Sequence, residues 1–105
     1  MKTLTLSEFQ GYLASNKPSC FVYSTANQKE IHSTLSGMAR YANARVSLNT
    51  MRIMLYGNDG YLCLNRVQSV AVGDAENSDP VWIDVVCTAF DGKKVKYSIM
   101  ATNKS

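Results

Sequence analysis

Residues that commonly form catalytic or metal sites are scarce in this 105-residue sequence, which has one histidine, His32, and three cysteines. The cysteines, Cys20, Cys63 and Cys87, are far apart and lack the short spacing of zinc ligands. No glycine-rich phosphate-binding motif is present, and the acidic stretch at 74–80 lacks the spacing of a calcium-binding loop. We therefore expect no metal, no cofactor and no enzyme activity.

Long apolar runs are also missing from the sequence. No stretch approaches the roughly 18 residues that a membrane span requires, and the first residues lack the apolar core of a signal peptide. Each cysteine lies in an apolar run, which is typical of buried, reduced thiols and not of a disulfide framework. These features predict a cytoplasmic protein that does not contact a membrane.

Length and composition predict one globular domain spanning residues 1–105, since the chain is 46% hydrophobic and 18% charged. A net charge of +3 is too small to indicate nucleic-acid binding by itself, but the charges are unevenly distributed. Residues 40–66 hold four arginines against one aspartate, residues 67–92 hold five acidic residues and no basic one, and residues 93–105 hold four lysines. Such segregation is typical either of solvated strand faces or of a binding surface.

The N-terminal segment has the signature of a short helix. Thr5 and Glu8 have the spacing of a capping box, in which each side chain bonds the backbone N–H of the other residue. Pro18 disfavours helical geometry in the residue before it, so the pattern predicts a helix over about residues 6–15. Residues 19–25 are rich in β-branched and aromatic side chains, which predicts a strand.

Residues 26–47 allow two interpretations. Their apolar side chains recur at the spacing of a helix face. The segment also contains serines, a threonine and Gly37, which are indifferent or poor helix formers, so a strand with a loop is equally consistent. The sequence leaves both open. The apolar positions in question are Ile31, Leu35, Met38, Ala42 and Val46.

The second half of the chain has the pattern of a β-sheet. Residues 51–56 and 61–64 flank Gly57-Asn58-Asp59-Gly60, which is a strong hairpin signal. A further strand is predicted over residues 67–72, followed by a polar loop over 74–80. Alternation along the hairpin places four apolar residues on one face: Ile53, Leu55, Leu62 and Leu64.

The last hairpin, formed by residues 81–90 and 93–101, has a register that its apolar residues determine. A three-residue loop of Phe90, Asp91 and Gly92 collects the apolar side chains on one face, whereas a two-residue loop mixes them with polar ones. The predicted pairs are Ile83 with Ile99, Val85 with Tyr97 and Cys87 with Val95, which leaves Trp82, Val86, Phe90 and Met100 on the other face.

These elements predict an α+β fold, in which a short N-terminal helix is followed by a mostly antiparallel sheet of five or six strands, curled or partly closed into a barrel. The face that carries Trp82 has two interpretations. It is either exposed, as in an interaction surface, or covered by another segment as a second core layer.

The exposed alternative leads to our first functional hypothesis, a small non-catalytic protein-binding module. Such a module regulates or inhibits a partner protein by blocking the partner's surface, in the style of small proteins encoded by phages and mobile elements, and a homodimer is one form of it. Tryptophan, tyrosine and arginine are enriched in protein interfaces. The predicted contact residues are Trp82, Phe90, Tyr56, Tyr61, Arg52 and Arg66.

The second hypothesis is a domain that binds single-stranded nucleic acid or a small nucleotide. Cations and aromatic rings alternate through the Arg40–Arg66 segment, a combination that can follow a phosphate backbone and stack on bases. A steep loss of affinity with added salt would distinguish this hypothesis from the first. Its predicted residues are Arg40, Tyr41, Arg45, Arg52, Tyr56, Tyr61 and Arg66.

Overall fold

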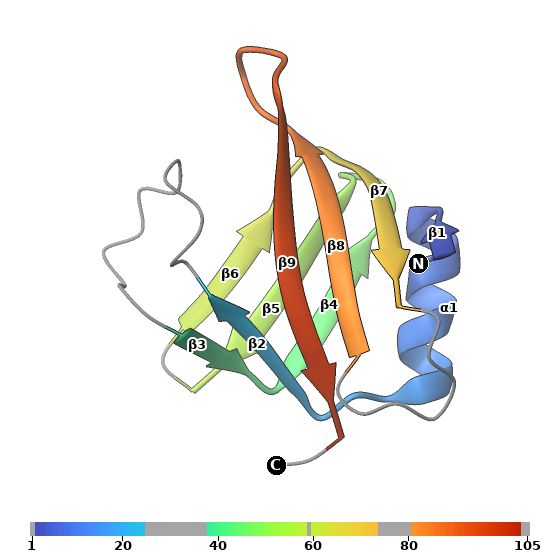
Figure 1. Ribbon diagram of the computed structural model, residues 1–105, viewed down its shortest axis with the longest axis vertical. Helices are drawn as coiled ribbons and strands as arrows, with labels where there is room; N and C mark the ends of the chain where they lie inside the picture. Colours follow the sequence, from blue (N-terminus) through green and yellow to red (C-terminus); the bar gives the residue numbers. More distant parts are fainter. Residues whose placement is uncertain (1, 25–37, 59, 74–80, 104–105) are drawn as a thin grey trace.

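The chain forms two antiparallel sheets and one helix (Figure 1), in a computed structural model that describes residues 2–24, 38–58, 60–73 and 81–103. The strands of the smaller sheet lie behind β8 and β9 and run obliquely to them, and α1 lies beside β1 and β7. The helix α1 spans Leu6–Asn16. The larger sheet has the order β1 (Lys2–Leu4), β7 (Val67–Val72), β8 (Val81–Thr88), β9 (Lys94–Thr102), β2 (Cys20–Ser24) and β3 (Met38–Tyr41), and the smaller has the order β4 (Asn43–Ser47), β5 (Arg52–Gly57) and β6 (Gly60–Leu64).

The sheet-dominated α+β class is therefore confirmed. The described residues form two sheets, of six and three strands, where we expected a single sheet of five or six strands, and they close no barrel. The chain changes sheet at two corners. At Ala42, between β3 and β4, the backbone N–H donates to the Tyr56 carbonyl at 2.8 Å. At Arg66, between β6 and β7, the backbone adopts a left-handed φ of 53°, which interrupts strand pairing. Each corner turns the next strand away from the sheet that precedes it.

The first corner requires a glycine. A Cβ at Gly57 would lie 2.7 Å from the Arg40 carbonyl oxygen, which is closer than a side chain can approach. The missing side chain lets the end of β5 approach β3, so the two sheets meet there.

Helix α1 begins and ends as the sequence predicts, within one residue. The Glu8 N–H donates to Thr5 Oγ1 at 3.1 Å and the Thr5 N–H donates to Glu8 Oε1 at 2.9 Å, which completes the capping box. The residue that caps the C-terminal end of the helix is Lys17, whose backbone is left-handed with a φ of 45° and whose N–H donates to the Leu13 carbonyl. Phe9 is buried from this helix and packs in the core.

Both hairpin registers are confirmed. In β5–β6, Ile53 pairs with Leu64 and Leu55 with Leu62. In β8–β9, Ile83 pairs with Ile99, Val85 with Tyr97 and Cys87 with Val95. The Gly92 N–H donates to the Ala89 carbonyl at 2.9 Å, and Gly92 has a φ of 83°, as a three-residue loop with a left-handed glycine requires.

The hydrophobic core lies between the inner faces of the two sheets and is closed at one end by α1. Alternation along each strand assigns one side to this core and the other to the outside. The fully buried side chains include Phe21, Tyr23, Ile53, Leu55, Leu64, Val70, Ile83 and Val85.

The structure decides part of the ambiguous segment at 26–47 and the burial of the cysteines. Residues 38–47 form β3 and β4, so the helical interpretation is wrong for this part of the segment, and the strand at 19–25 is confirmed as β2. Residues 26–37 and the predicted loop at 74–80 lie outside the described residues. All three cysteines are free thiols; Cys87 is buried, whereas Cys20 and Cys63 are half-buried, so full burial is confirmed for one of the three.

Candidate functional site

The six predicted contact residues lie in three separate places. Trp82 points outward from the larger sheet, because its neighbour Ile83 faces the core. Tyr56, Tyr61 and Arg52 lie on the outer face of the smaller sheet. Because the core separates the two sheets, these two outer faces point in opposite directions. The remaining two residues, Phe90 and Arg66, meet at the end of the β8–β9 hairpin.

The outer face of the smaller sheet combines arginine, tyrosine and methionine. Tyr56 pairs with Tyr61, and their ring centroids are 6.1 Å apart. The Tyr56 hydroxyl donates to Met54 Sδ at 3.3 Å, and Met54 in turn pairs with Arg45 on β4. Tyr61 is 69% exposed and Tyr56 is 37% exposed. We call this surface the arginine–tyrosine face and define it by Arg45, Arg52, Met54, Tyr56 and Tyr61.

The arginine–tyrosine face is positively charged. Arg45 and Arg52 are both exposed, and within the described part of the chain neither forms an ion pair. No carboxylate stands on this face among those residues of β4, β5 and β6 that the structure describes. Its charge is therefore available to an acidic partner or to phosphates.

The outer face of the larger sheet carries one apolar row. Trp82 pairs with Met100, Met100 with Val22, and Val22 with Arg40, across four neighbouring strands. Trp82 is 55% exposed, so the prediction that its face points away from the core is confirmed. Val22 is buried although it lies on this outer side, and Met100 is half-buried. The accessible apolar surface of this row is therefore mainly the indole of Trp82.

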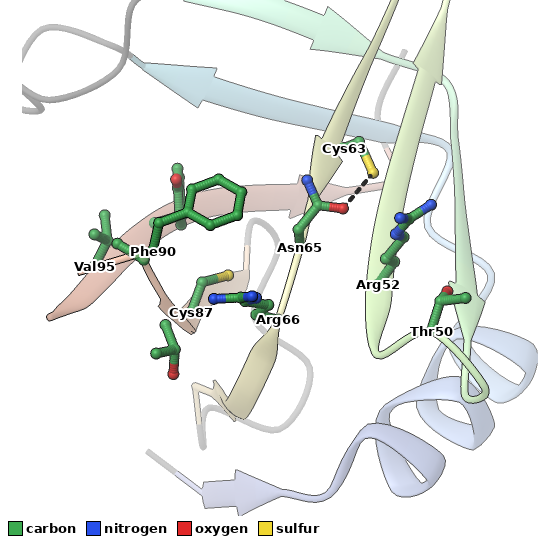
Figure 2. A pocket seen from close by; sticks show the side chains of 11 residues that line it. Thr50, Arg52, Cys63, Asn65, Arg66, Cys87, Phe90 and Val95 are labelled. Atoms are coloured by element: carbon green, nitrogen blue, oxygen red, sulfur yellow. Dashed lines mark hydrogen bonds between the residues drawn. The ribbon is translucent and has the colours of Figure 1, made fainter. Parts of the chain in front are cut away.

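A cavity of about 600 Å³ lies between the β5–β6 hairpin and the β8–β9 hairpin. Figure 2 shows Phe90, Cys87 and Arg66 on one side of it and Arg52 and Thr50 on the other. The Arg66 guanidinium carbon lies 4.8 Å from the centre of the Phe90 ring, and Phe90 is 96% exposed. The lining residues are Thr50, Arg52, Cys63, Asn65, Arg66, Cys87, Thr88, Ala89, Phe90, Val95 and Tyr97.

The seven residues of the nucleic-acid hypothesis are also divided. Arg45, Arg52, Tyr56 and Tyr61 share the arginine–tyrosine face. Tyr41 is buried in the core, so its ring cannot stack on a base. Alternation along β3 turns Arg40, the neighbour of Tyr41, to the outside of the larger sheet, while Arg66 lines the cavity.

The described residues show no constellation for acid–base or nucleophilic chemistry. Burial, with a smaller effect of the neighbouring Cys63 thiol, raises the pKa of Cys87 to about 11. Cys87 is therefore a thiol at neutral pH and a poor nucleophile. Among the same residues no group of three or more potential metal ligands occurs. His32 lies outside the described residues. The absence of enzyme activity stays a prediction.

Sequence reasoning identified Arg52, Arg66 and Phe90 as surface residues, but it did not bring them together with Cys63 or Thr50 in one cavity. Thr50, Arg52 and Cys63 come from the smaller sheet and its turn, Arg66 from the corner between β6 and β7, and Phe90 from the β8–β9 hairpin of the other sheet. Their proximity depends on how the two sheets pack, and no local pattern in the sequence reports that packing.

Comparisons with known proteins give no further information about this site. In the part of the chain that the structure describes, α1 is too short to cross a membrane. No protein-family model matches the chain, and the search of curated proteins and the search of solved structures gave no match either.

Proposed function

We propose that this protein is a small non-catalytic binding module that regulates or inhibits a partner protein by covering part of the partner's surface. The observation that carries the proposal is the arginine–tyrosine face, where Tyr61 is 69% exposed beside Tyr56, Met54 and two arginines that form no ion pair with any described residue. Tyrosine, methionine and arginine are the residues in which protein interfaces are enriched.

The face is already arranged for binding. The tyrosine pair and the Tyr56 hydroxyl bonded to Met54 restrict these side chains before any partner arrives. Side chains that are ordered in the free protein lose less conformational entropy on association. The positive charge of Arg45 and Arg52 favours a partner surface that carries carboxylates. The proposed partner is therefore a protein with an acidic epitope.

Trp82 belongs to a second surface, on the opposite side of the molecule. A partner seated on the arginine–tyrosine face does not reach Trp82 unless it wraps around the domain. We therefore remove Trp82 from the proposed contact residues and use it as a matched control for Tyr61 on the arginine–tyrosine face. Both side chains are large, aromatic and more than half exposed, so Tyr61→Ala and Trp82→Ala remove comparable surface.

The test compares these variants in capture from a lysate of the organism that encodes the protein, followed by titration with the purified partner. One acidic protein should be retained by the wild type and by Trp82→Ala. Tyr61→Ala should weaken its binding by more than about 1 kcal/mol, roughly fivefold in Kd, and Arg45→Glu should weaken it further. Equal retention by all variants, or loss with Trp82→Ala alone, would overturn the proposal.

A second function, binding of single-stranded nucleic acid, is favoured by one observation: Arg45, Arg52, Tyr56 and Tyr61 share one face. Two arginines neutralise about two phosphates, so log K should fall with log salt with a slope of about −1.4. Titration of labelled oligonucleotides over a salt series measures this slope. Binding to oligonucleotides that requires Tyr61, with no protein retained, would replace the first proposal by this one.

A further inference from the structure

The cavity between the two hairpins carries charge of one sign. Arg52 and Arg66 contribute guanidinium groups to its lining, and none of the lining residues that the structure describes is acidic. Within the described residues neither arginine forms an ion pair; the contact of Arg66 is with the Phe90 ring. Two uncompensated cations in a concave site attract an anion more strongly than the same charges on a convex surface.

The other walls of the cavity are apolar. Cys87 and Val95 form a pair on β8 and β9, and Phe90 stands at the tip of the same hairpin. Cys87 is buried and uncharged at neutral pH, so it behaves as a small apolar side chain here. A volume of about 600 Å³ lies within the range of small-molecule sites, which combine apolar walls with a few polar anchors. The polar anchors of this site are the arginines with Thr50, Asn65 and Thr88.

The backbone at Arg66 adds an independent observation. Its φ of 53° is the left-handed conformation, which is unfavourable for an L-residue with a long side chain and is easier for glycine or asparagine. The Arg66 carbonyl accepts from the Thr88 N–H at 3.0 Å, which fixes this corner against β8. At this corner the Arg66 guanidinium lies over the Phe90 ring at the cavity wall.

We propose that this cavity binds a small organic anion. A carboxylate, sulfonate or phosphate group lies against Arg52 and Arg66, and an aromatic or aliphatic body lies against Phe90, Cys87 and Val95. The cavity goes beyond the proposed protein-binding function and overlaps the arginine–tyrosine face only at Arg52, because Tyr61, Tyr56 and Arg45 do not line it. Arg52 belongs to both surfaces, and Arg66 belongs to the cavity alone.

The first test uses anilinonaphthalene sulfonate, a fluorescent aromatic anion, as the probe. We expect one molecule to bind per chain, with an affinity at least tenfold weaker in Arg66→Asn and Arg52→Gln. Asparagine is chosen at position 66 because it tolerates the left-handed backbone. Arg45→Gln removes the same charge from the neighbouring face and should leave the affinity unchanged, as should Tyr61→Ala. Circular dichroism verifies that each variant is folded.

The second test measures protection of a thiol. Cys63 lines the cavity and Cys20 does not, although both are half-buried, so Cys20 is an internal control. Saturation with the probe should slow alkylation of Cys63 several-fold and leave Cys20 unchanged, as read by peptide mass spectrometry. The proposal requires both results. Undiminished binding to the Arg66→Asn variant, or unprotected Cys63, would overturn it and assign the fluorescence to adsorption on exposed rings. Neither result depends on whether a protein partner is captured.

Discussion

The proposed binding surfaces require exposed aromatic rings that contribute little to the stability of the fold. Two phenylalanines, one buried and one exposed, test this requirement. Phe9 is 2% exposed in the core and its ring lies 6.1 Å from that of Tyr12, whereas Phe90 is 96% exposed and contacts Arg66. Removing a buried phenylalanine ring typically lowers the free energy of unfolding by about 3–5 kcal/mol. Removing an exposed ring that makes one cation–π contact should lower it by at most about 1 kcal/mol.

Urea unfolding followed by circular dichroism measures both changes. With a slope of about 1–3 kcal/mol/M for a domain of this size, Phe90→Ala should shift the midpoint by less than about 1 M. Phe9→Ala should shift it by more than that, or leave the chain unfolded. Equal losses in the two variants would refute the reasoning, because Phe90 would then be packed into the core and the end of the β8–β9 hairpin would not be a free surface.

Four further predictions concern the stability of the fold and the reactivity of its thiols. Gly11 and Gly92 both have open space where a Cβ would lie, so Gly11→Ala should raise the free energy of unfolding by about 0.5–1 kcal/mol, since alanine is the better helix former. Gly92→Ala should lower it by about 1–2 kcal/mol in the same urea assay, because the φ of 83° there disfavours a side chain; equal signs would contradict both assignments. In native protein at about pH 8, Cys87 should be alkylated more slowly than Cys20 or Cys63, as mass spectrometry of labelled peptides will show, because burial raises its pKa to about 11. Burial, and then the neighbouring Tyr97 and Tyr41, raise the pKa of Tyr23 to about 12. In the unfolded chain the Cys87 thiol and the Tyr23 phenol have their ordinary pKa values of 9.0 and 10.0. The free energy of unfolding that these two raised pKa values contribute is therefore fully present below pH 9 and should be lost as the pH rises toward about 11 for Cys87 and about 12 for Tyr23. A free energy of unfolding that stays constant over this pH range in urea titrations would be the contrary result.

The local parts of the fold could be predicted because their signals are local. The capping box of Thr5 and Glu8 fixes the start of α1 through bonds between residues three apart. The β8–β9 register follows from alternation, since only one loop length places Val85 opposite Tyr97 on a common apolar face. In these cases the hydrogen bonds and the apolar pattern favour the same arrangement, so a single sequence is sufficient.

The division into two sheets could not be predicted in this way. It depends on a hydrogen bond between Ala42 and Tyr56, which are 14 residues apart in the sequence, and on the left-handed backbone at Arg66. Arginine is not a residue type that predicts a left-handed conformation. Tyr41 shows the consequence for the site. In the sequence it stands among cations and other tyrosines, yet its place at the end of β3 turns it into the core.

The arginine–tyrosine face is a direct product of strand alternation. Ile53 and Leu55 occupy the core side of β5, so Arg52, Met54 and Tyr56 must point outward. Slippage by one residue would bury the Arg52 guanidinium without a partner and expose both aliphatic side chains, which is costly on both counts. The same apolar pattern that stabilises the core therefore fixes which side chains form the arginine–tyrosine face. It also sends Trp82 to the far side, because Ile83 holds the inner position on β8. Core packing and the composition of both outer faces are thus set by the same residues.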